Sequence, residues 1–273
     1  MNHQDSLGGA SLRDALALVY QLTGNTMDPD RTELLEGRLR RRVRALGLPS
    51  ISDYLQKVQS GQVDPQEEQD LIEAITTHKT SFFRTRSVWD YLEESVLANL
   101  PKSKRLRAWS AACSTGQEPY SLGMLGLHHA KNVRGSFDVL ASDVSPVSVR
   151  KAEEGLYPCK QLKDAETSRP NWNPSQYFKP VDSEHVVANP ELKDCIEFRT
   201  HNLFDSPQGG PFDLVLLRNV IIYFTEADKA KVILKVCDSI PAGGLLVIGE
   251  SESLGDRFPS LEYISPCIYR KKN

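Results

Sequence analysis

The feature that most constrains the fold of this chain is a change of periodicity near residue 106. Residues 1–85 repeat their apolar side chains at helical spacing, whereas later apolar runs alternate with amphipathic segments. Those runs are "LRAWSAA", "FDVLASD", "IEFRTHNLF", "FDLVLLRN", "GLLVIGE" and "LEYISPCIYRK". The alternation predicts an α/β fold with a doubly wound, parallel sheet, and it leaves open an antiparallel hairpin for the last strand.

The amino-terminal part predicts a small helical bundle. Two apolar stripes at helical spacing are formed by Leu12, Leu16, Val19 and Tyr20 and by Leu35, Leu39, Val43 and Leu46. The second stripe ends at Gly47, and a later helix starts at "DPQE", where Asp64 and Glu67 have the spacing of a capping box. We therefore predict a helical domain over residues 1–85 and an α/β domain over residues 86–273.

Residues 155–194 break this alternation. The segment is rich in Pro, Asn, Ser and charged residues, and it is too long for a plain connection. It predicts a small inserted subdomain with its own short strands or helices.

Bulk properties narrow the class of protein. The net charge is −3, and no apolar run approaches the roughly 20 residues that span a bilayer. The first residues, "MNHQDSLGGA", lack the pattern of a secretory signal, so a cytoplasmic location without membrane insertion is expected. The 5 cysteines are scattered and lack a C-x-x-C pair, which predicts neither disulfides nor a metal site. For Cys113, packing beside a cofactor is favoured over a nucleophilic role.

The turn "AACSTGQEPYS" after the first strand indicates the cofactor. It lacks the G-x-G-x-x-G fingerprint of dinucleotide sites, since only Gly116 is present. Glu118 would repel phosphates but attract a cation, and S-adenosylmethionine carries a sulfonium and an ammonium without a phosphate. The second strand ends at Asp143, where an acidic side chain typically binds ribose hydroxyls. Capping of the next helix is the alternative role for Asp143.

Six segments together carry a resemblance to a known family. They are "TSFFR" (80–84), "WSAACSTGQEPYS" (109–121), "ASD" (141–143), "NLFD" (202–205), "FDLVLLRNVIIYF" (212–224) and "GGLLVIGESES" (243–253). Over nearly its whole length the chain resembles the CheR family of chemotaxis-receptor methyltransferases. The resemblance implies a Rossmann-like methyltransferase sheet with a small inserted subdomain, preceded by an all-helical domain that recognises the substrate. It also implies a protein-glutamate O-methyltransferase that converts S-adenosylmethionine to S-adenosylhomocysteine and acts on cytoplasmic helices of chemoreceptors.

The same resemblance assigns site residues position by position. The implied cofactor contacts are His78, Thr80, Arg84, Glu118, Asp143, Asn202, Leu203, Leu217 and Arg218. Arg84 and Tyr223 are implied as the catalytic residues, which hold a substrate carboxylate beside the transferable methyl group. The family usually has Asn where this chain has His78, and we expect the histidine to keep one hydrogen bond to the cofactor.

Arginines crowd the segment "RLRRRVRALG" of a chain whose net charge is negative. Arg31, Arg38 and Arg42 repeat at helical spacing. A solvated face or a nucleic-acid patch are the alternatives, but an acidic receptor helix is the favoured partner. The predicted substrate contacts are therefore Arg38, Arg41 and Arg42, and no nucleic acid is expected as a partner.

Two rival functions remain at this stage. The first is a methyltransferase of another substrate class, although "RNVIIYF" occupies the place of the "NPPY"-like turn of amine-methylating enzymes. The second is a non-catalytic signalling adaptor, against which the intact set of Thr80, Arg84, Glu118, Asp143 and Tyr223 argues. Tyr223 could also be structural, and Phe82 and Phe83 are predicted as core anchors.

Some relatives grip a peptide at the receptor C-terminus by adding it as an extra strand to the insertion. Here the corresponding stretch, "YFKPVDSEHVVANPEL" (177–192), is short, has no glycine and carries Pro180 and Pro190. We predict that this enzyme does not depend on such a pentapeptide tether.

Overall fold

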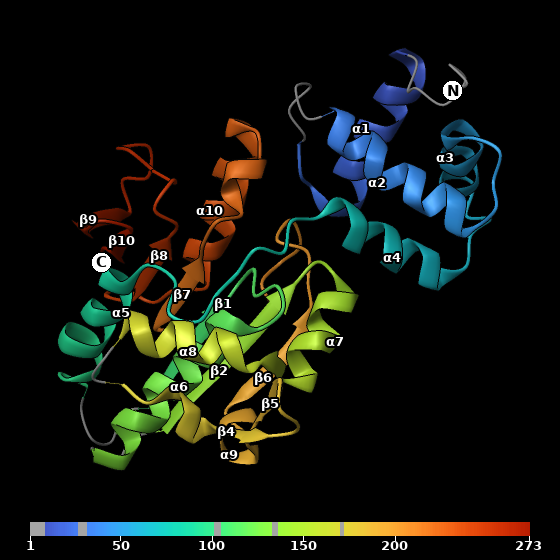
Figure 1. The fold of residues 1–273 in the computed structure, drawn as a ribbon. Helices are drawn as coiled ribbons and strands as arrows, with labels where there is room; N and C mark the ends of the chain where they lie inside the picture. Colours follow the sequence, from blue (N-terminus) through green and yellow to red (C-terminus); the bar gives the residue numbers. More distant parts are fainter. Residues whose placement is uncertain (1–8, 27–31, 101–104, 133–135, 170–171) are drawn as a thin grey trace.

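The computed structural model describes residues 9–26, 32–100, 105–132, 136–169 and 172–273 (Figure 1). Among them, α1 (Gly9–Thr23), α2 (Thr32–Ala45), α3 (Ile51–Gln59) and α4 (Pro65–Ile75) form the amino-terminal domain. Leu35, Leu39, Tyr54 and Leu71 are buried at its centre, so the apolar stripes of the helices account for their packing. The all-helical character of the amino-terminal domain is confirmed, and its predicted boundary at residue 85 stays a prediction. Arg31 lies outside the described residues.

The start of α4 differs in one detail from the predicted capping box. Asp64 caps the helix, because its carboxylate accepts a hydrogen bond from the N–H of Gln66 at 2.7 Å. Glu67 does not reach back to close the box. It is buried, and its carboxylate accepts hydrogen bonds from Arg42 and from the hydroxyl of Tyr54. Tertiary partners therefore outcompete the local cap.

A seven-stranded sheet within the described residues organises the second domain. Its order is β6 (Ile196–Thr200), β2 (Ser136–Asp143), β1 (Arg105–Ser110), β7 (Leu214–Leu217), β8 (Leu245–Ile248), β10 (Ile268–Lys271) and β9 (Leu261–Ser265). The first five strands in this order are parallel, and β10 and β9 are antiparallel. In register, Trp109 of β1 lies between Leu140 of β2 and Val215 of β7. The doubly wound fold is confirmed, and the last strands form a hairpin.

Helices cover both faces of this sheet. One face carries α6 (Gln117–Asn132) and α5 (Arg86–Tyr91), which continues as the π-helix η3 (Leu92–Leu97). The other face carries α10 (Glu226–Asp238), and α7 (Pro146–Glu154) connects β2 to the insertion. No helix in the described parts of the chain has the length and apolar character needed to cross a lipid bilayer.

The insertion forms a small subdomain, as predicted. It comprises β3 (Leu156–Pro158), α8 (Cys159–Ser168), η4 (Pro174–Tyr177), β4 (Phe178–Pro180), β5 (His185–Ala188) and α9 (Pro190–Lys193). Its three strands are antiparallel in the order β3, β5, β4. The hydroxyl of Tyr157 donates to the carbonyl of Thr115 at 2.7 Å, so the insertion supports the turn after β1. Gly116 has a φ of +96°, and a Cβ there would lie 2.6 Å from that hydroxyl.

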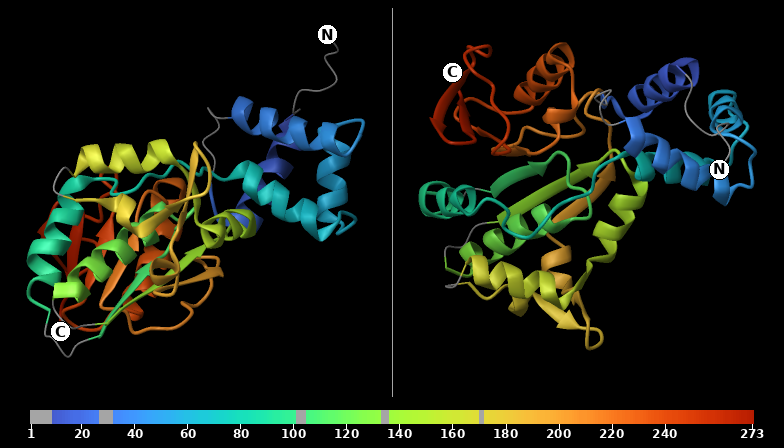
Figure 2. Two further views of the ribbon diagram at one scale, coloured as in Figure 1. Left: turned by 60° about the horizontal axis from the view of Figure 1, so that its bottom comes forward. Right: turned by 45° about the horizontal axis from the view of Figure 1, so that its top comes forward.

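The helical domain lies beside the α/β domain (Figure 2), and the contacts between their described residues include the following two. The first contact is between α4 and α7. In the second, the residues after α1 reach the segment around Tyr223, whose carbonyl accepts hydrogen bonds from the N–H and the hydroxyl of Thr26 at 2.7 and 2.8 Å. Both domains consequently border the same region at the carboxyl ends of the strands.

Candidate active site

A cavity of about 870 Å³ opens at the carboxyl ends of the parallel strands. The chain proceeds from β1 to β2 on one side and from β7 to β8 on the other, so the cavity lies at the point where the strand order reverses. The ends of α1 and α4 close it from the helical domain through Thr23, Asn25 and Thr76. Of the residues predicted for the site, those in its wall are His78, Thr80, Arg84, Glu118, Asp143, Asn202, Leu203, Arg218 and Tyr223.

Glu118 lies in the first turn of α6, on the floor of the cavity. Its carboxylate accepts a hydrogen bond from the Ser110 hydroxyl at 2.8 Å and pairs with Arg218 at 3.0 Å. Burial raises the pKa of Glu118, and the pair with Arg218 opposes this only in part. A cation entering the cavity would stabilise the charged carboxylate further.

Asp143 is the last residue of β2. Its two carboxylate oxygens accept hydrogen bonds from the backbone N–H groups of Ser114 at 2.8 Å and Ser145 at 3.0 Å. Burial raises the pKa of Asp143, although these N–H groups favour the charged form. The carboxylate is therefore fixed in orientation, with lone pairs left for the hydroxyls of a ribose.

Arg84 is presented by a strained segment. Its neighbours Phe83 and Thr85 both have a left-handed backbone, with φ of 50° and 67°. The carbonyl of Arg84 accepts hydrogen bonds from the indole of Trp89 and from Arg218, both at 2.8 Å. Such strain persists only where surrounding contacts enforce it, which is typical of functional sites. The Arg84 guanidinium keeps further donors beside its 3.1 Å bond to the Lys79 carbonyl.

Tyr223 belongs to η5 (Ile221–Tyr223), a 3₁₀ turn that follows β7. The residue is half-buried, and the hydrogen bonds from Thr26 hold its backbone. Upstream, Asn219 has a φ of 59°, and its N–H donates to the Glu252 carboxylate at 2.9 Å. Sequence reasoning missed this role of Glu252. Its only signal is the acidic residue in "GESES" just after a buried strand.

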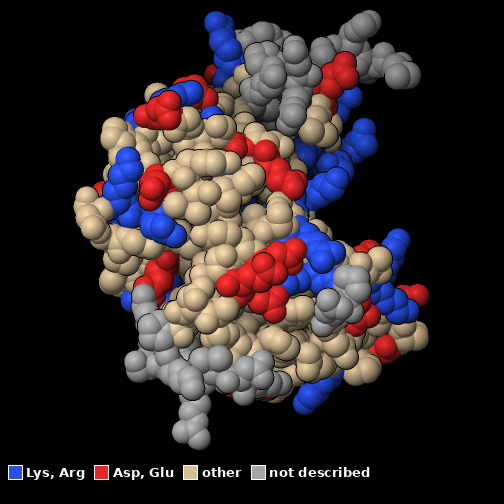
Figure 3. All heavy atoms as spheres, turned by 90° about the vertical axis from the view of Figure 1, so that its left-hand side faces the viewer, with Lys and Arg blue, Asp and Glu red and all other residues tan. Residues whose placement is uncertain are grey.

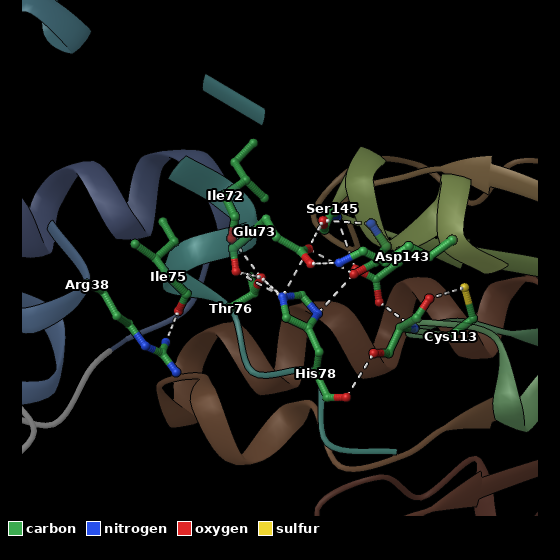
Figure 4. A network of polar contacts seen from close by, with 12 residues as sticks. Arg38, Ile72, Glu73, Ile75, Thr76, His78, Cys113, Asp143 and Ser145 are labelled. Atoms are coloured by element: carbon green, nitrogen blue, oxygen red, sulfur yellow. Dashed lines mark hydrogen bonds and ion pairs between the residues drawn. The ribbon is translucent and has the colours of Figure 1, made fainter. Parts of the chain in front are cut away.

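Two predicted cofactor contacts, His78 and Leu217, stay predictions, and their surroundings differ from those of the other predicted site residues. The Nδ1 atom of His78 lies 3.0 Å from the Ser148 hydroxyl, and its Nε2 lies 2.7 Å from the Thr76 hydroxyl and 3.2 Å from the Glu73 carboxylate (Figure 4). Both ring nitrogens therefore contact protein groups, while the residue itself lies in the cavity wall. Leu217 is fully buried in the core on the α10 side and is not part of the cavity wall.

One glutamate at the contact between the helical domain and the α/β domain was not predicted from the sequence. Glu73, in α4, accepts hydrogen bonds from Ser145 at 2.6 Å, Ser148 at 3.0 Å and Lys151 at 2.8 Å. Burial alone would raise the pKa of Glu73, but the bonds from Lys151 and the two serines outweigh burial and lower it. No motif marks this residue, because its partners follow β2 and are remote in sequence.

The arginines of α2 do not act as one stripe. Arg42 contacts Glu67 and Asp70 inside the helical domain, and the bond to Glu67 raises the pKa of Arg42 above its usual range. These pairs give Arg42 a structural role, and its role in substrate binding stays a prediction. Arg38 is half-buried and donates to the Ile75 carbonyl at 2.8 Å, whereas Arg41 is exposed. None of the three lines the cavity.

Cys113 lies in the turn after β1 and is buried. Burial raises the pKa of its thiol well above the usual range, which favours the packing role over a nucleophile.

On the face that carries α5, β9 and β10, acidic and basic side chains are interspersed around a wide uncharged area (Figure 3).

The donor set of the cavity fits S-adenosylmethionine. Glu118 matches the ammonium group of its methionine part, and Asp143 matches the ribose hydroxyls. Leu203, Val220 and Phe224 add an apolar wall suited to a purine. A doubly wound sheet with an antiparallel last hairpin, combined with this cavity, defines a methyltransferase that uses S-adenosylmethionine.

Comparison with known families gives the particular one. The family model described as "CheR methyltransferase, SAM binding domain" matches residues 78–266, and "CheR methyltransferase, all-alpha domain" matches residues 10–76. The chain belongs to the CheR methyltransferase family. A chemotaxis protein methyltransferase of Salmonella typhimurium is 31% identical, covering 98% of this chain and 92% of that protein. A chemotaxis protein methyltransferase of Escherichia coli is 32% identical, and the match covers 93% of this chain and 87% of that protein. One of Listeria innocua is 36% identical, and the match covers 68% of this chain and 69% of that protein.

Proposed function

We propose that this enzyme transfers the methyl group of S-adenosylmethionine to glutamate side chains of chemoreceptors and forms glutamate methyl esters. The observation that carries the proposal is the position of Arg84 and Tyr223 in the wall that also holds Glu118 and Asp143. A guanidinium and a phenol are suitable donors for a substrate carboxylate. The names of relatives that match along nearly the whole chain support chemoreceptors as the substrate.

The chemistry needs no general base. A glutamate side chain has a pKa of about 4.3 and is already the ionised nucleophile at neutral pH. Bound S-adenosylmethionine supplies an electrophilic methyl group on a good leaving group. Arg84 and Tyr223 would hold one carboxylate oxygen so that the other points at the methyl carbon. Glu118 and Asp143 would fix the two ends of the cofactor, and Arg218 would keep Glu118 in place.

Substrate recognition is assigned to the exposed side of α2. Arg41 is exposed there, and Arg38, three residues earlier, donates a hydrogen bond to the Ile75 carbonyl at the end of α4. Burial and the neighbouring Arg41 lower the pKa of Arg38, so an acidic partner would relieve the repulsion between two nearby cations. A glutamate-bearing receptor helix supplies such carboxylates.

A methylation assay tests the proposal. The purified chain is incubated with S-adenosylmethionine labelled in the methyl group and with a cytoplasmic receptor fragment. We expect transfer to the fragment, release of the label as methanol by mild base, and loss of transfer in Arg84→Ala. Base-stable label on the receptor would indicate a methylated nitrogen instead of an ester. Labelling of a nucleic acid but not of the receptor would contradict the proposed substrate.

A further inference from the structure

His201 is a buried histidine whose ring has no hydrogen-bond partner. It follows β6 directly, is 4% exposed, and packs against the indole of Trp109 with ring centroids 5.9 Å apart. Neither Nδ1 nor Nε2 finds a hydrogen-bond partner among the described residues. His78, by contrast, has both ring nitrogens in contact with protein groups. Both ring nitrogens of His201 are therefore buried and without a partner among the described residues.

Such a ring is unfavourable unless a further group supplies its hydrogen bonds. A buried polar atom without a partner destabilises a folded protein, and folded proteins contain few of them. Burial also lowers the pKa of His201, while Asp205 and Lys235 act in opposite directions. The ring is consequently neutral at neutral pH, with one N–H donor and one acceptor nitrogen. It is suited to a neutral ligand that also carries donors and acceptors.

The position of His201 identifies that ligand. The residue lines the cavity next to Asn202 and Leu203. Its backbone N–H donates to the carbonyl of Asp143 at 2.9 Å, so it lies one strand away from the carboxylate that fits the ribose. With the ribose at Asp143 and the ammonium group at Glu118, the base must lie on the side of β6. Adenine carries an amino donor and ring-nitrogen acceptors along its edges.

We propose that His201 forms a hydrogen bond with the adenine of S-adenosylmethionine and makes the site selective for that base. It is a specificity-determining residue that acts on the cofactor, far from the transferred methyl group. The proposal concerns binding and holds whichever side chain accepts the methyl group. Failure of the receptor assay would therefore leave it intact.

The test is calorimetric binding of base-altered cofactor products to the full chain. The probes are S-adenosylhomocysteine, its 7-deaza and 3-deaza forms, and S-inosylhomocysteine, which together alter each polar edge of the base. We expect the wild type to bind at least one altered probe about tenfold more weakly than S-adenosylhomocysteine. His201→Phe keeps a ring against Trp109 but has no hydrogen bond. This variant should bind S-adenosylhomocysteine about tenfold more weakly than the wild type does. It should also bind that altered probe and S-adenosylhomocysteine with similar affinities, so that the penalty for altering the base is lost.

A matched control is His129→Phe. The Nε2 atom of His129 is also buried without a partner, but the residue lies in α6 and does not line the cavity. This variant should keep the wild-type affinity and the wild-type penalties. If His201→Phe does not fold, His201→Leu carries the same comparison. Wild-type affinity of the His201 variant for S-adenosylhomocysteine, or equal penalties for every probe in both proteins, would overturn the proposal.

Discussion

The carboxylate of Glu73 in the helical domain accepts a hydrogen bond of 2.6 Å from the hydroxyl of Ser145 in the α/β domain. The backbone N–H of the same serine donates to Asp143 at 3.0 Å. One residue thus connects a helix of the amino-terminal helical domain to the carboxylate that fits the ribose. The helical domain therefore borders the cofactor cavity and also helps to hold one of its carboxylates in position.

The hydrogen bond between Glu73 and Ser145 predicts that Glu73→Ala weakens binding of S-adenosylhomocysteine about threefold to tenfold, although Glu73 does not line the cavity. The reason is that Ser145 and Ser148 lose their acceptor, and the segment after Asp143 is held less firmly. Glu73→Gln keeps an acceptor oxygen and should lose less. Calorimetry measures both variants. Gln69→Ala, which removes the 2.8 Å contact to Arg150 at the same interface, is the control. Equal effects of Gln69→Ala and Glu73→Ala would contradict the specific role of Glu73.

The two carboxylates of the cavity give a stronger prediction. Glu118→Ala and Asp143→Ala should each weaken cofactor binding roughly tenfold or more, because a hydrogen bond to a charged group typically contributes about 1.5–3 kcal/mol. Glu197→Ala, at an exposed carboxylate of β6, should leave binding unchanged. Wild-type calorimetric affinity in both cavity variants would refute the cofactor assignment.

The raised pKa of Glu118 predicts how binding depends on pH. In the empty protein this carboxylate takes up a proton at a higher pH than an ordinary glutamate, and only its charged form attracts the ammonium group. Affinity for S-adenosylhomocysteine should therefore fall as the pH is lowered from about 8 to about 5, with the loss beginning above the usual range near 4.3. Asp143 shifts in the same direction, so Glu118→Gln should flatten the dependence only in part. A wild-type affinity that stays constant down to about pH 5 would contradict this prediction.

Much of the fold followed from the sequence because its causes are local. Apolar runs between turn residues predicted the strands, and the ends of two of them placed Glu118 and Asp143 near each other. The resemblance added Arg84 and Tyr223, which local patterns alone did not distinguish from core residues. These positions depend on strand order, which the alternation of elements determines.

The sequence did not reveal the contacts of side chains whose partners are remote in sequence. Arg42 was predicted to contact the substrate, and the packing of α2 against α4 places Glu67 beside it. His78 contacts Ser148, which precedes the inserted subdomain, and Glu252 reaches back to Asn219. Charge and spacing along one helix do not reveal which neighbour a long side chain will bind. Such pairs become visible only when the tertiary structure is known.

The arginines of α2 should separate into two classes on mutation. Arg42→Ala leaves the buried Glu67 without its cation, so we expect a loss of about 3 kcal/mol in the stability of the helical domain. Arg41→Glu changes an exposed side chain and should leave stability and cofactor affinity unchanged while it slows receptor methylation. Urea unfolding and initial rates at low and high salt measure the two effects, and salt should slow the wild type. Wild-type methylation by Arg41→Glu would leave α2 without a role in docking.

The last prediction is that this enzyme methylates receptors with and without a C-terminal tether at similar rates. A tethering peptide would have to add a strand to the inserted sheet, whose outer strands are β3 and β4. Each is 3 residues long and ends in a proline, Pro158 or Pro180, which has no N–H to donate. The turn between β4 and β5 is closed by Asp182, which accepts the N–H groups of Glu184 and His185 at 2.7 Å each.

These short outer strands leave few backbone groups for a five-residue ladder, and the glycine-free turn leaves little freedom to lengthen it. We therefore expect no calorimetric binding of a C-terminal receptor pentapeptide at micromolar concentration. Rates on tailed and tail-deleted receptors should agree within about twofold, which corresponds to roughly 0.4 kcal/mol. Val181→Gly with Ser183→Gly, which loosens the turn, is the matched variant and should not create dependence on the tail by itself. Micromolar binding of the pentapeptide together with a large loss of rate on deletion of the tail would show that the insertion does hold a tether.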